Sequence, residues 1–463
     1  MKCQVFSALR LPCVLAWVLF LLGSGAAAQQ VGITLPPTSI LPNYDRLPIG
    51  QTEALEAGAY LARAEGASAA WYNPAGMALA EKSGFNASAV AYEWNSVSVE
   101  GVGTSTTRSR FSSVSTLVAA VIGQPIIHSE RWRLGFALGK PVSWQPGRSD
   151  GAFTLPTSRG DARFSYSSDV SFSTLVPAFA AAYAPRKGLR FGTSVGVGWT
   201  GLDQVQDVTA RTVSADSVIS LRRSFQSDGQ SAAALFTLGA QWDFASGWTT
   251  AAMITSPGLR LWGSSLVLYD ASVIRRDRSG DLYFRDPDAR FEYRLPMGVG
   301  FGVARRFQSW AIEANLRYHQ STDDYALFSS PVAAQVVEVN GGGPPTQSQL
   351  PFRDVRHQAR NIWNTALGGH VDLNQHWTIH LGVFSDKSPV ADPPTSMFRK
   401  ANLYGGTGGV TLRSTHLSGA LGLGYTFGTA PNLLLASLPD GTSLGTELKV
   451  RNLSLNYAIA YEF

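Results

Sequence analysis

The sequence predicts an all-β protein, a transmembrane antiparallel β-barrel of about 14 strands preceded by an N-terminal hatch, or plug, that contains short helices. Three observations predict this fold class. Apolar and polar residues alternate along most of the chain with a period of two, which is the period of a strand. After residue 28 no run reaches the roughly 18 apolar residues that a transmembrane helix needs. Short connections alternate with long ones, as in barrels with short turns at one end and long loops at the other.

Residues 1–28 have the composition of a secretory signal peptide. A basic start, an apolar core over 11–22 and a tail of small residues predict cleavage before Gln29. An uncleaved membrane anchor is the alternative, and the long small-residue tail argues against it. Both cysteines, Cys3 and Cys13, lie in this segment. The mature chain is therefore expected to lack disulfides and thiolate metal sites.

The charge balance argues against a nucleic-acid partner. The chain has 38 basic and 33 acidic residues, and its arginines are scattered rather than gathered on one stretch. Acidic residues cluster between 277 and 288, where a bound cation is one interpretation. Arginines are interspersed among them, which favours ion pairs in water. We expect no metal and no other cofactor. The cluster consists of Asp277, Asp281, Asp286 and Asp288.

The hatch is expected over residues 29–83, which do not alternate. Residues 29–50 are rich in proline, and 51–68 have a helix-favouring composition. The sequence Asn73-Pro74-Ala75-Gly76 then breaks any helix, because proline lacks a backbone N–H and restricts the residue before it. An ordinary helix-ending turn is the alternative interpretation. We favour a sharp turn inside the barrel, since a wide barrel with small lumen residues leaves room for a packed segment.

The barrel is expected over residues 84–463, and its last strand shows the pattern most clearly. In "LSLNYAIAYEF" large residues such as Leu453, Tyr457 and Phe463 share one face, and small or polar residues share the other. The segments "RFGTSVGVGW", "LPMGVGFGVA" and "LSGALGLGYTF" repeat the pattern with glycine, alanine or serine opposite the large residues. A soluble sandwich is the alternative, but it would place charges opposite its core face. The large residues are therefore expected to face lipid.

About fourteen alternating segments can be counted, an even number, as is usual for such barrels. The long connections between them carry apolar residues that we expect to capture an apolar ligand: Leu266, Leu268, Ala326, Leu327 and Phe328. The predicted strands are 84–97, 109–123, 131–144, 165–184, 189–204, 228–243, 248–264, 289–306, 310–326, 356–373, 377–388, 411–428, 431–438 and 446–463.

The third and fourth predicted strands carry residues that weaken a sheet. Gly135, Gly139 and Pro141 lie in "RWRLGFALGKPVSW", and Pro177 lies in "TLVPAFAAAY". Proline cannot donate to the ladder, and strand glycines mark bends. The four residues predict a kink and a weak place in the wall between these two strands. Harmless bulges are the alternative.

The sequence does not predict an enzyme. No His-Glu-x-x-His, Gly-x-Ser-x-Gly or Walker sequence is present. His370 and Asp372 share a strand face, but no motif places a nucleophile beside them.

Several segments resemble, in order, those of the FadL/TodX-type outer-membrane transporters of long-chain fatty acids and aromatic hydrocarbons. The segment "AGAYLARAEGASAAWYNPAGMALAE" resembles the family's hatch, which an Asn-Pro-Ala turn marks. Three later segments resemble its hairpins: "GAQWDFASGWTTAAMITSP", "LPMGVGFGVARRFQSWAIEANLRY" and "LGGHVDLNQHWTIHLGVFSDKSPVAD". The sequence departs from the family's pattern in two places. It has Glu65-Gly66 where the family commonly has an acidic residue just before its small-residue run, and it has an additional Pro-rich stretch, 29–50.

The resemblance implies a passive transporter of hydrophobic compounds in the outer membrane of a Gram-negative bacterium, with sideways release beside the hatch at a kink in the third strand. Its expected partners are the hydrophobic substrate, outer-membrane lipid and lipopolysaccharide, and the barrel-assembly machinery, which would recognise the terminal Phe463. A nonspecific porin or a surface adhesin is the alternative function.

Overall fold

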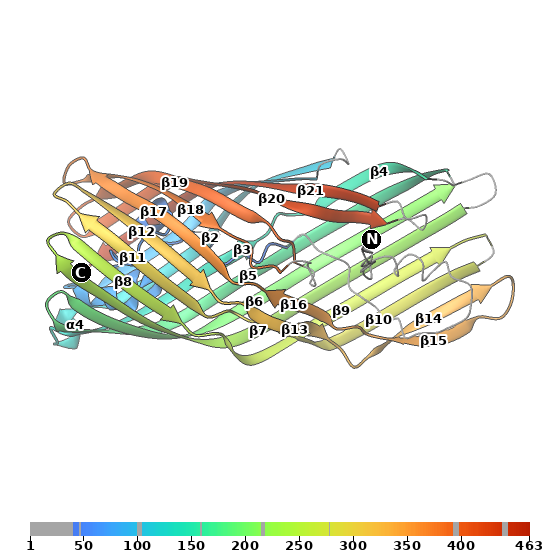
Figure 1. The fold of residues 1–463 in the computed structure, drawn as a ribbon, viewed down its shortest axis with the longest axis horizontal. Coiled ribbons are helices and arrows are strands. Elements are labelled where there is room, and N and C mark those ends of the chain that lie inside the picture. Colours follow the sequence, from blue (N-terminus) through green and yellow to red (C-terminus); the bar gives the residue numbers. More distant parts are fainter. Residues whose placement is uncertain are drawn as a thin grey trace, which may run out of the picture.

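The wall of the molecule is one closed antiparallel sheet, as Figure 1 shows, in which the first strand pairs with the last. The computed structural model describes residues 40–45, 48–99, 104–157, 160–213, 218–276, 278–391, 398–437 and 443–463. The predicted signal peptide, residues 1–28, and the first part of the predicted hatch, 29–39, lie outside the described residues.

In the described part of the chain the sheet contains 21 strands. Their bounds are β1 Gly84–Val99, β2 Thr104–Ile122, β3 Trp132–Trp144, β4 Ser149–Thr157, β5 Gly160–Arg186, β6 Leu189–Val213, β7 Val218–Ala245, β8 Trp248–Thr255, β9 Leu259–Ile274, β10 Arg278–Phe291, β11 Gly298–Arg306, β12 Trp310–His319, β13 Thr322–Ser329, β14 Ala333–Asn340, β15 Thr346–Pro351, β16 Val355–Ala359, β17 Ile362–Asp372, β18 Trp377–Asp386, β19 Asn402–Arg413, β20 Leu417–Ser437 and β21 Ser443–Glu462.

These strands make fourteen passes through the barrel wall, which confirms the predicted fold class and the even strand number. Some passes consist of two labelled strands in line, because the ladder is interrupted part-way along. β14 and β15 form an additional hairpin beyond the wall, where β14 pairs with the start of β10. The interrupted passes are β3 with β4, β8 with β9, β10 with β11, β12 with β13, and β16 with β17.

Near the C-terminus the predicted strands were partly wrong. The structure has β19 at Asn402–Arg413 and β20 at Leu417–Ser437, where the sequence predicted strands over 411–428 and 431–438. β19 reads "NLYGGTGGVTLR", and its glycines leave almost no apolar alternation to detect. β20 continues through Pro431, at which the prediction divided it. The predicted number of strands still equals the observed number of passes, because the prediction missed one strand, β19, and divided another, β20.

The long connections were also partly wrong, since much of their length is strand. β6 and β7 stay paired from Leu189–Trp242 to Val213–Val218, so most of the predicted connection 205–228 is ladder. Two residues expected to capture ligand, Leu327 and Phe328, are fully buried instead. Phe328 packs against Phe291 with ring centroids 4.9 Å apart, inside a large aromatic core of the outer half of the barrel.

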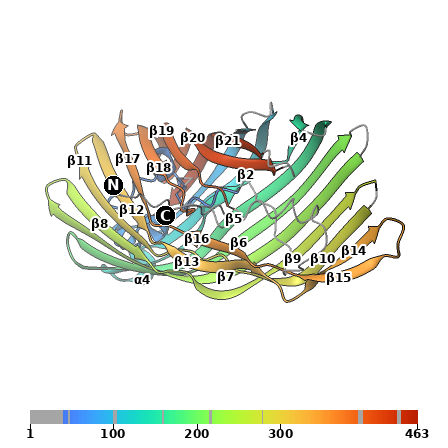
Figure 2. The ribbon, with the colours of Figure 1, turned by 45° about the vertical axis from the view of Figure 1, so that its right-hand side comes forward.

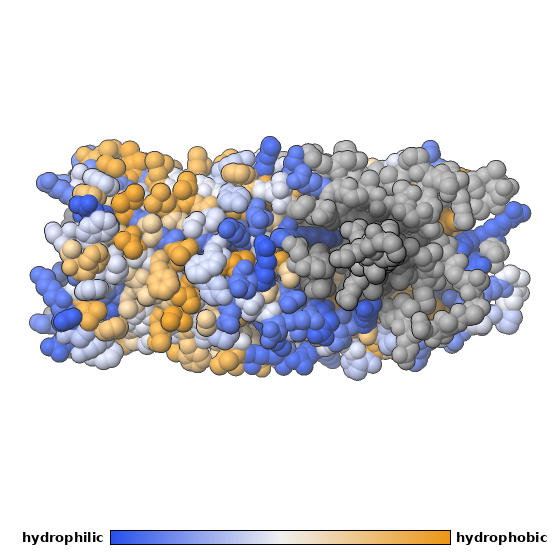
Figure 3. Space-filling model, in the orientation of Figure 1, coloured by the Kyte–Doolittle hydropathy of each residue, from blue (hydrophilic) through white to orange (hydrophobic). Residues whose placement is uncertain are grey.

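The outward face of the barrel carries an apolar belt. Phe179, Leu238 and Leu381 expose 72%, 61% and 68% of their surface, although each is large and apolar. Figure 3 shows hydrophobic residues gathered over the half of the barrel that carries the short turns, while the residues coloured in the other half are mostly hydrophilic. Such a belt is typical of a barrel wall that faces lipid. The predicted alternation, with the large residues on the outward face, is confirmed.

The described helices are short, and all but one precede the first strand. They are α2 Thr52–Leu55, α3 Ala69–Tyr72 and the 3-10 helix η1 Pro74–Leu79, with α4 Gln124–Ile127 in a turn between strands. The helix expected over 51–68 is thus reduced to four residues, because Ala57 and Gly58 adopt φ of 57° and 71°, outside the right-handed helical region. In the described part of the chain no helix is long and apolar enough to cross a membrane.

Candidate ligand-binding site and hatch

Residues 48–83 lie inside the barrel, at the end that carries the short turns (Figure 2). α2 contacts β18, β19 and β20 on one side of the lumen, and α3 contacts β2, β3 and β5 on the other. η1 contacts β5, β6 and β7. Most side chains of the segment are buried, with small alanines facing the wall. The segment therefore crosses the lumen and touches the wall on several sides.

Asn73 connects two helices and holds the Asn-Pro-Ala turn together. It ends α3 in an extended conformation and begins η1, where its Oδ1 accepts a hydrogen bond from Ala75 N at 3.2 Å. Its Nδ2 donates to Leu61 O at 3.1 Å and to Ala240 O, on β7, at 3.2 Å. Pro74 takes the first helical position, where a backbone N–H would have no acceptor within the helix, so its absence costs no hydrogen bond. The helix break predicted from sequence is thus a turn bonded both to the hatch and to the wall.

Two paired glycines of the wall make room for this turn. Gly192 on β6 lies opposite Gly239 on β7 in the ladder. A Cβ atom at Gly239 would collide with Asn73 Oδ1, and one at Gly192 would collide with the backbone of Pro74 and Ala75. The close approach of hatch backbone to wall backbone therefore depends on the absence of both side chains.

A buried ion cluster fastens the hatch to the opposite wall. It consists of Glu56 and Arg63 of the hatch with Glu313, His370 and His380 of the wall. The Glu313 carboxylate accepts hydrogen bonds from the backbone N–H of Leu61, Ala62 and Arg63 at 2.5, 2.8 and 3.0 Å, and from Arg63 Nε at 3.0 Å.

The remaining bonds of the cluster converge on Glu56. His370 Nδ1 and His380 Nδ1 lie 2.9 and 2.8 Å from Glu56 Oε1, and Arg63 Nη2 donates to Oε2. Burial alone would raise the pKa of Glu56, but the two histidine hydrogen bonds and the Arg63 charge outweigh it and hold the pKa below its ordinary value. The carboxylate therefore stays ionised inside the barrel.

The same three residues could in principle ligate a metal, since Glu56, His370 and His380 place one ligand atom each within 4.8 Å of one another. However, Arg63 Nη1 lies 3.2 Å from His370 Nδ1, and a guanidinium ion at that distance opposes a second cation. The geometry instead supports an ion pair with hydrogen-bonded histidines.

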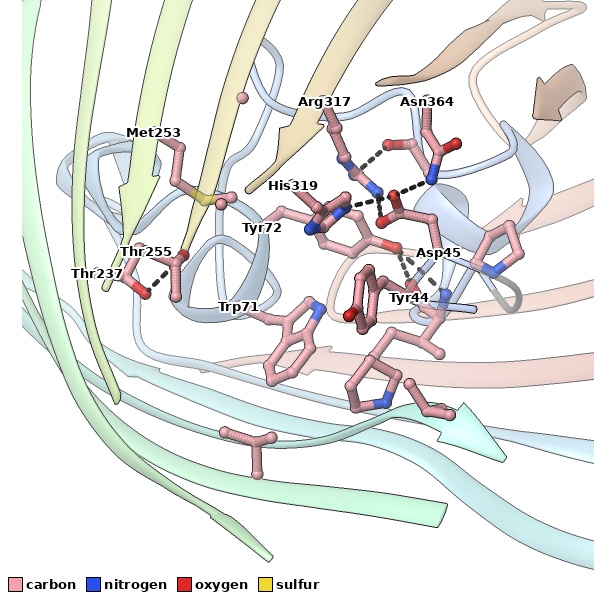
Figure 4. Close-up of a pocket in the computed structure, with 18 of the residues that line it drawn as sticks. Tyr44, Asp45, Trp71, Tyr72, Thr237, Met253, Thr255, Arg317, His319 and Asn364 are labelled. Atoms are coloured by element: carbon pink, nitrogen blue, oxygen red, sulfur yellow. Dashed lines mark hydrogen bonds and ion pairs between the residues drawn. The ribbon is translucent and has the colours of Figure 1, made fainter. Parts of the chain in front are cut away.

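Between the hatch and the wall lies a cavity of about 250 Å³, shown in Figure 4. A cavity of about 150 Å³ suffices for benzene, so this one accommodates a single-ring hydrocarbon or a short stretch of alkyl chain. Most of its lining is apolar or uncharged. The hatch side contributes Tyr44, Asp45, Pro48, Ile49, Ala57, Gly58, Ala70, Trp71 and Tyr72, and the wall contributes, among others, Pro141, Val142, Val176, Leu235, Met253, Leu295, Arg317, His319 and Asn364.

The charged groups of the cavity are gathered at Asp45 (Figure 4). Asp45 Oδ1 accepts from Arg317 Nη1 at 3.0 Å, and Oδ2 lies 2.9 Å from His319 Nε2 and 2.8 Å from Asn364 Nδ2. Burial would raise the pKa of Asp45, but the charges of His319 and Arg317 outweigh it and hold the pKa well below its usual range. The cavity thus has an apolar body and one internally neutralised polar corner.

One of the predicted kink residues, Pro141, lines this cavity, and two others, Gly135 and Gly139, contact the lumen segment. The Trp71 ring of α3 packs against Gly139, where a Cβ atom would collide with it, and Pro141 lines the cavity. Gly135 faces Met77 and Ala70 in the same way. Gly135 and Gly139 are therefore positions where the lumen segment packs closely against the wall.

The weak place in the wall is not between the strands that the sequence indicated. β3 and β5 are paired from Trp132 to Trp144 with one register shift between Gly139 and Val142, and Pro177 lies opposite Leu138 within that ladder. The pairs recorded between β2 and β3 run only from Ile122–Leu134 to Leu117–Gly139. β2 itself continues to Thr104, paired with β1. Among the described residues, the ladder beyond Gly139 is therefore interrupted between the second and third strands.

Comparison with solved structures matches nearly the whole chain. A FadL homologue from Pseudomonas aeruginosa aligns with a TM-score of 0.59 and 13% identity, covering 94% of this chain and 100% of that one. The Pseudomonas putida toluene transporter TodX aligns with a TM-score of 0.59 and 14% identity, covering 90% and 99%. The CymD monoaromatic hydrocarbon channel aligns with a TM-score of 0.55 and 14% identity, covering 91% and 99%.

The chain has the FadL/TodX fold. The likeness predicted from the sequence is thereby confirmed at the level of fold. No protein-family model and no curated protein matches the sequence.

Sequence reasoning missed the polar corner of this FadL-type barrel. Tyr44 and Asp45 belong to the Pro-rich stretch to which no role was assigned, and Arg317 and His319 lie on β12. A signal was present in "WAIEANLRYH": Glu313, Asn315, Arg317 and His319 alternate with apolar residues and so share the inward face of the strand. Polar inward residues among otherwise small ones indicate a lumen site.

Proposed function

We propose that the protein is an outer-membrane channel of the FadL type for passive uptake of hydrophobic compounds. The observation that carries the proposal is the largely apolar cavity between hatch and wall, in a barrel that shares its fold with a toluene transporter and a monoaromatic hydrocarbon channel. Residues 1–28 would direct export, 29–83 would form the hatch, and 84–463 the barrel. Lipopolysaccharide would surround its outer part, and Phe463 would be recognised during assembly.

The position of the hatch favours a selective channel over a nonspecific porin or an adhesin. A porin of this size leaves an aqueous lumen, whereas here residues 48–83 cross the lumen and contact the wall on several sides. An adhesin would need neither a cavity behind the hatch nor an interruption in the wall. A hydrophobic compound would move down its concentration gradient, without chemical change, from the outer end to the cavity.

Release would be sideways into the membrane, through the interruption between β2 and β3. Pro141 lines the cavity, and beyond Gly139 the recorded ladder joins β3 to β5 alone. An apolar molecule leaving there would pass from an apolar cavity into lipid without crossing water, which the hydrophobic effect favours. The turn formed by Asn73, Pro74, Ala75 and Gly76 would keep the hatch in its position beside this exit.

Uptake measurements test the channel itself. Cells that produce the protein are expected to take up labelled toluene or 1-decanol at least about tenfold faster than otherwise identical cells without it, since partition into an apolar site selects such compounds. Uptake of a hydrophilic disaccharide is expected to be the same in both strains. Equal stimulation of disaccharide uptake would instead support a porin, and no stimulation of either would exclude a channel.

A disulfide across the interruption tests the exit. In a Thr116→Cys/Lys140→Cys variant the two cysteines occupy the register that follows Leu117–Gly139, so oxidation would extend the closed ladder. We expect oxidation to reduce hydrophobic uptake to roughly a tenth, and a reductant to restore it. Val118→Cys/Leu138→Cys is the matched control, since this pair already lies in the ladder. If both variants transport equally fast when oxidised, release does not use this gap.

A further inference from the structure

We infer that Asp45 makes the cavity selective for uncharged ligands against their carboxylate analogues. This inference names the substrate class of the proposed channel and so rests on that function. Among the described residues that line the cavity, those able to carry charge are Asp45, Arg317 and His319. Arg317 and His319 are both paired with Asp45, which leaves no free cation there to hold an anion.

Asp45 occupies the position that a ligand carboxylate would need. Arg317, His319 and Asn364 all direct donors at its two oxygens, which is how a protein binds the carboxylate of a ligand. The side chain supplies this anion itself and is 14% exposed in the ion pair. A carboxylate ligand would therefore meet a like charge, at a place where Arg317, His319 and Asn364 already direct donors at Asp45.

A second acid strengthens the repulsion. Asp386, at the end of β18, is fully buried, and its Oδ1 accepts a hydrogen bond from Asp45 N at 3.2 Å. Asn364 lies between the two acids, with its Nδ2 3.5 Å from the same Asp386 oxygen. The polar corner thus holds two acidic side chains that both face the Asn364 amide. Such a like-charge arrangement discriminates by rejecting the wrong ligand rather than by adding contacts to the right one.

The chain segment that carries Asp45 is fixed to the wall. Ile40 O accepts from Arg399 N at 2.8 Å, and Asn43 Nδ2 donates to Asp386 O and Ala401 O at 2.9 and 3.0 Å. These contacts place residues 40–45 in the outer approach to the cavity. The Pro-rich stretch 29–50 thereby acquires a role, since its described part presents the group that sets ligand charge.

The matched ligands 1-decanol and decanoate test the inference. Binding of each labelled compound to the purified full-length protein in detergent is measured by equilibrium dialysis at pH 8, where decanoate is ionised. Wild-type protein is expected to bind 1-decanol at least about tenfold more tightly than decanoate. In Asp45→Asn, which keeps the size of the side chain but removes its charge, decanoate affinity is expected to rise about tenfold relative to 1-decanol.

Two further variants separate the charge effect from a change in shape. Asp45→Asn/Arg317→Met is expected to lose the gain in decanoate binding, because the freed cation is gone. Asp324→Asn, an exposed aspartate outside the cavity, is expected to keep the wild-type ratio. If Asp45→Asn does not give a folded, heat-modifiable band, the wild-type ratio alone decides.

The outcomes distinguish this inference from the channel proposal. Wild-type protein that binds decanoate as tightly as 1-decanol would overturn the inference and leave the channel standing. An unchanged ratio in folded Asp45→Asn would also overturn it. Wild-type protein that binds neither compound would contradict the proposed function itself.

Discussion

Removal of residues 29–80 is expected to convert the barrel into an open pore with at least about tenfold higher ion conductance, because a barrel of this size has a wide lumen once nothing fills it. The wall should survive, since β1 and β21 close it with their own ladder. Residues 81–83 are retained because Ser83 O accepts from Phe463 N, and Ser83 Oγ accepts from Gly123 N. Single-channel recording in planar bilayers measures the effect.

The control for this deletion is a shortened outer hairpin. Residues 341–345 form an exposed tip between β14 and β15, away from the lumen segment, and their loss is expected to leave conductance near the wild-type level. Both variants must show the heat-modifiable band of a folded barrel. If the folded variant without residues 29–80 conducts no better than wild type, residues 29–83 do not plug the lumen.

The fold was predictable because lipid imposes one rule on every strand. On β11, Phe301 and Val303 are 51% and 44% exposed while Gly300 and Gly302 face inward, so a period of two is visible in the sequence alone. The alternation is lost where contact with lipid does not determine which type of residue a position carries. β19 is glycine-rich, and the outer ends of β6 and β7 pair beyond the apolar belt with polar side chains on both faces.

The sequence could predict only those parts of the site whose structure depends on residues next to one another in the chain. Asn73-Pro74 breaks a helix wherever it stands, so the sequence indicated a turn, and Pro141 indicated a disturbed ladder. The polar corner depends on partners far apart in sequence: Asp45 and Arg317 are separated by 272 positions. No periodicity or spacing connects such residues, and the additional segment that carries Asp45 has no regular pattern of its own.

The residues of the buried ion cluster are also far apart in sequence, so the sequence did not predict the cluster. Breaking this cluster is expected to have the second large effect. Glu313→Ala should release the hatch locally, because Arg63 and the N–H groups of Leu61, Ala62 and Arg63 would lose their acceptor. Breaking a buried ion pair from one side costs about 3–5 kcal/mol. Amide hydrogen exchange over 58–64 should therefore accelerate by roughly 10² to 10³-fold, provided that it occurs through local opening.

Asp324→Ala is the matched control, because it also removes a carboxylate from an arginine, but in a pair whose two side chains are exposed. Asp324 Oδ2 lies 2.6 Å from Arg356 Nε, and the two side chains are 43% and 50% exposed, so the loss should cost no more than about 1 kcal/mol and leave exchange over 58–64 unchanged. Ion conductance of Glu313→Ala should rise above wild type, because a loosened hatch admits water, while the barrel keeps its folded band. If exchange over 58–64 is as slow in Glu313→Ala as in Asp324→Ala, the buried ion cluster does not hold the hatch in place, and the wall contacts of the Asn-Pro-Ala turn must suffice.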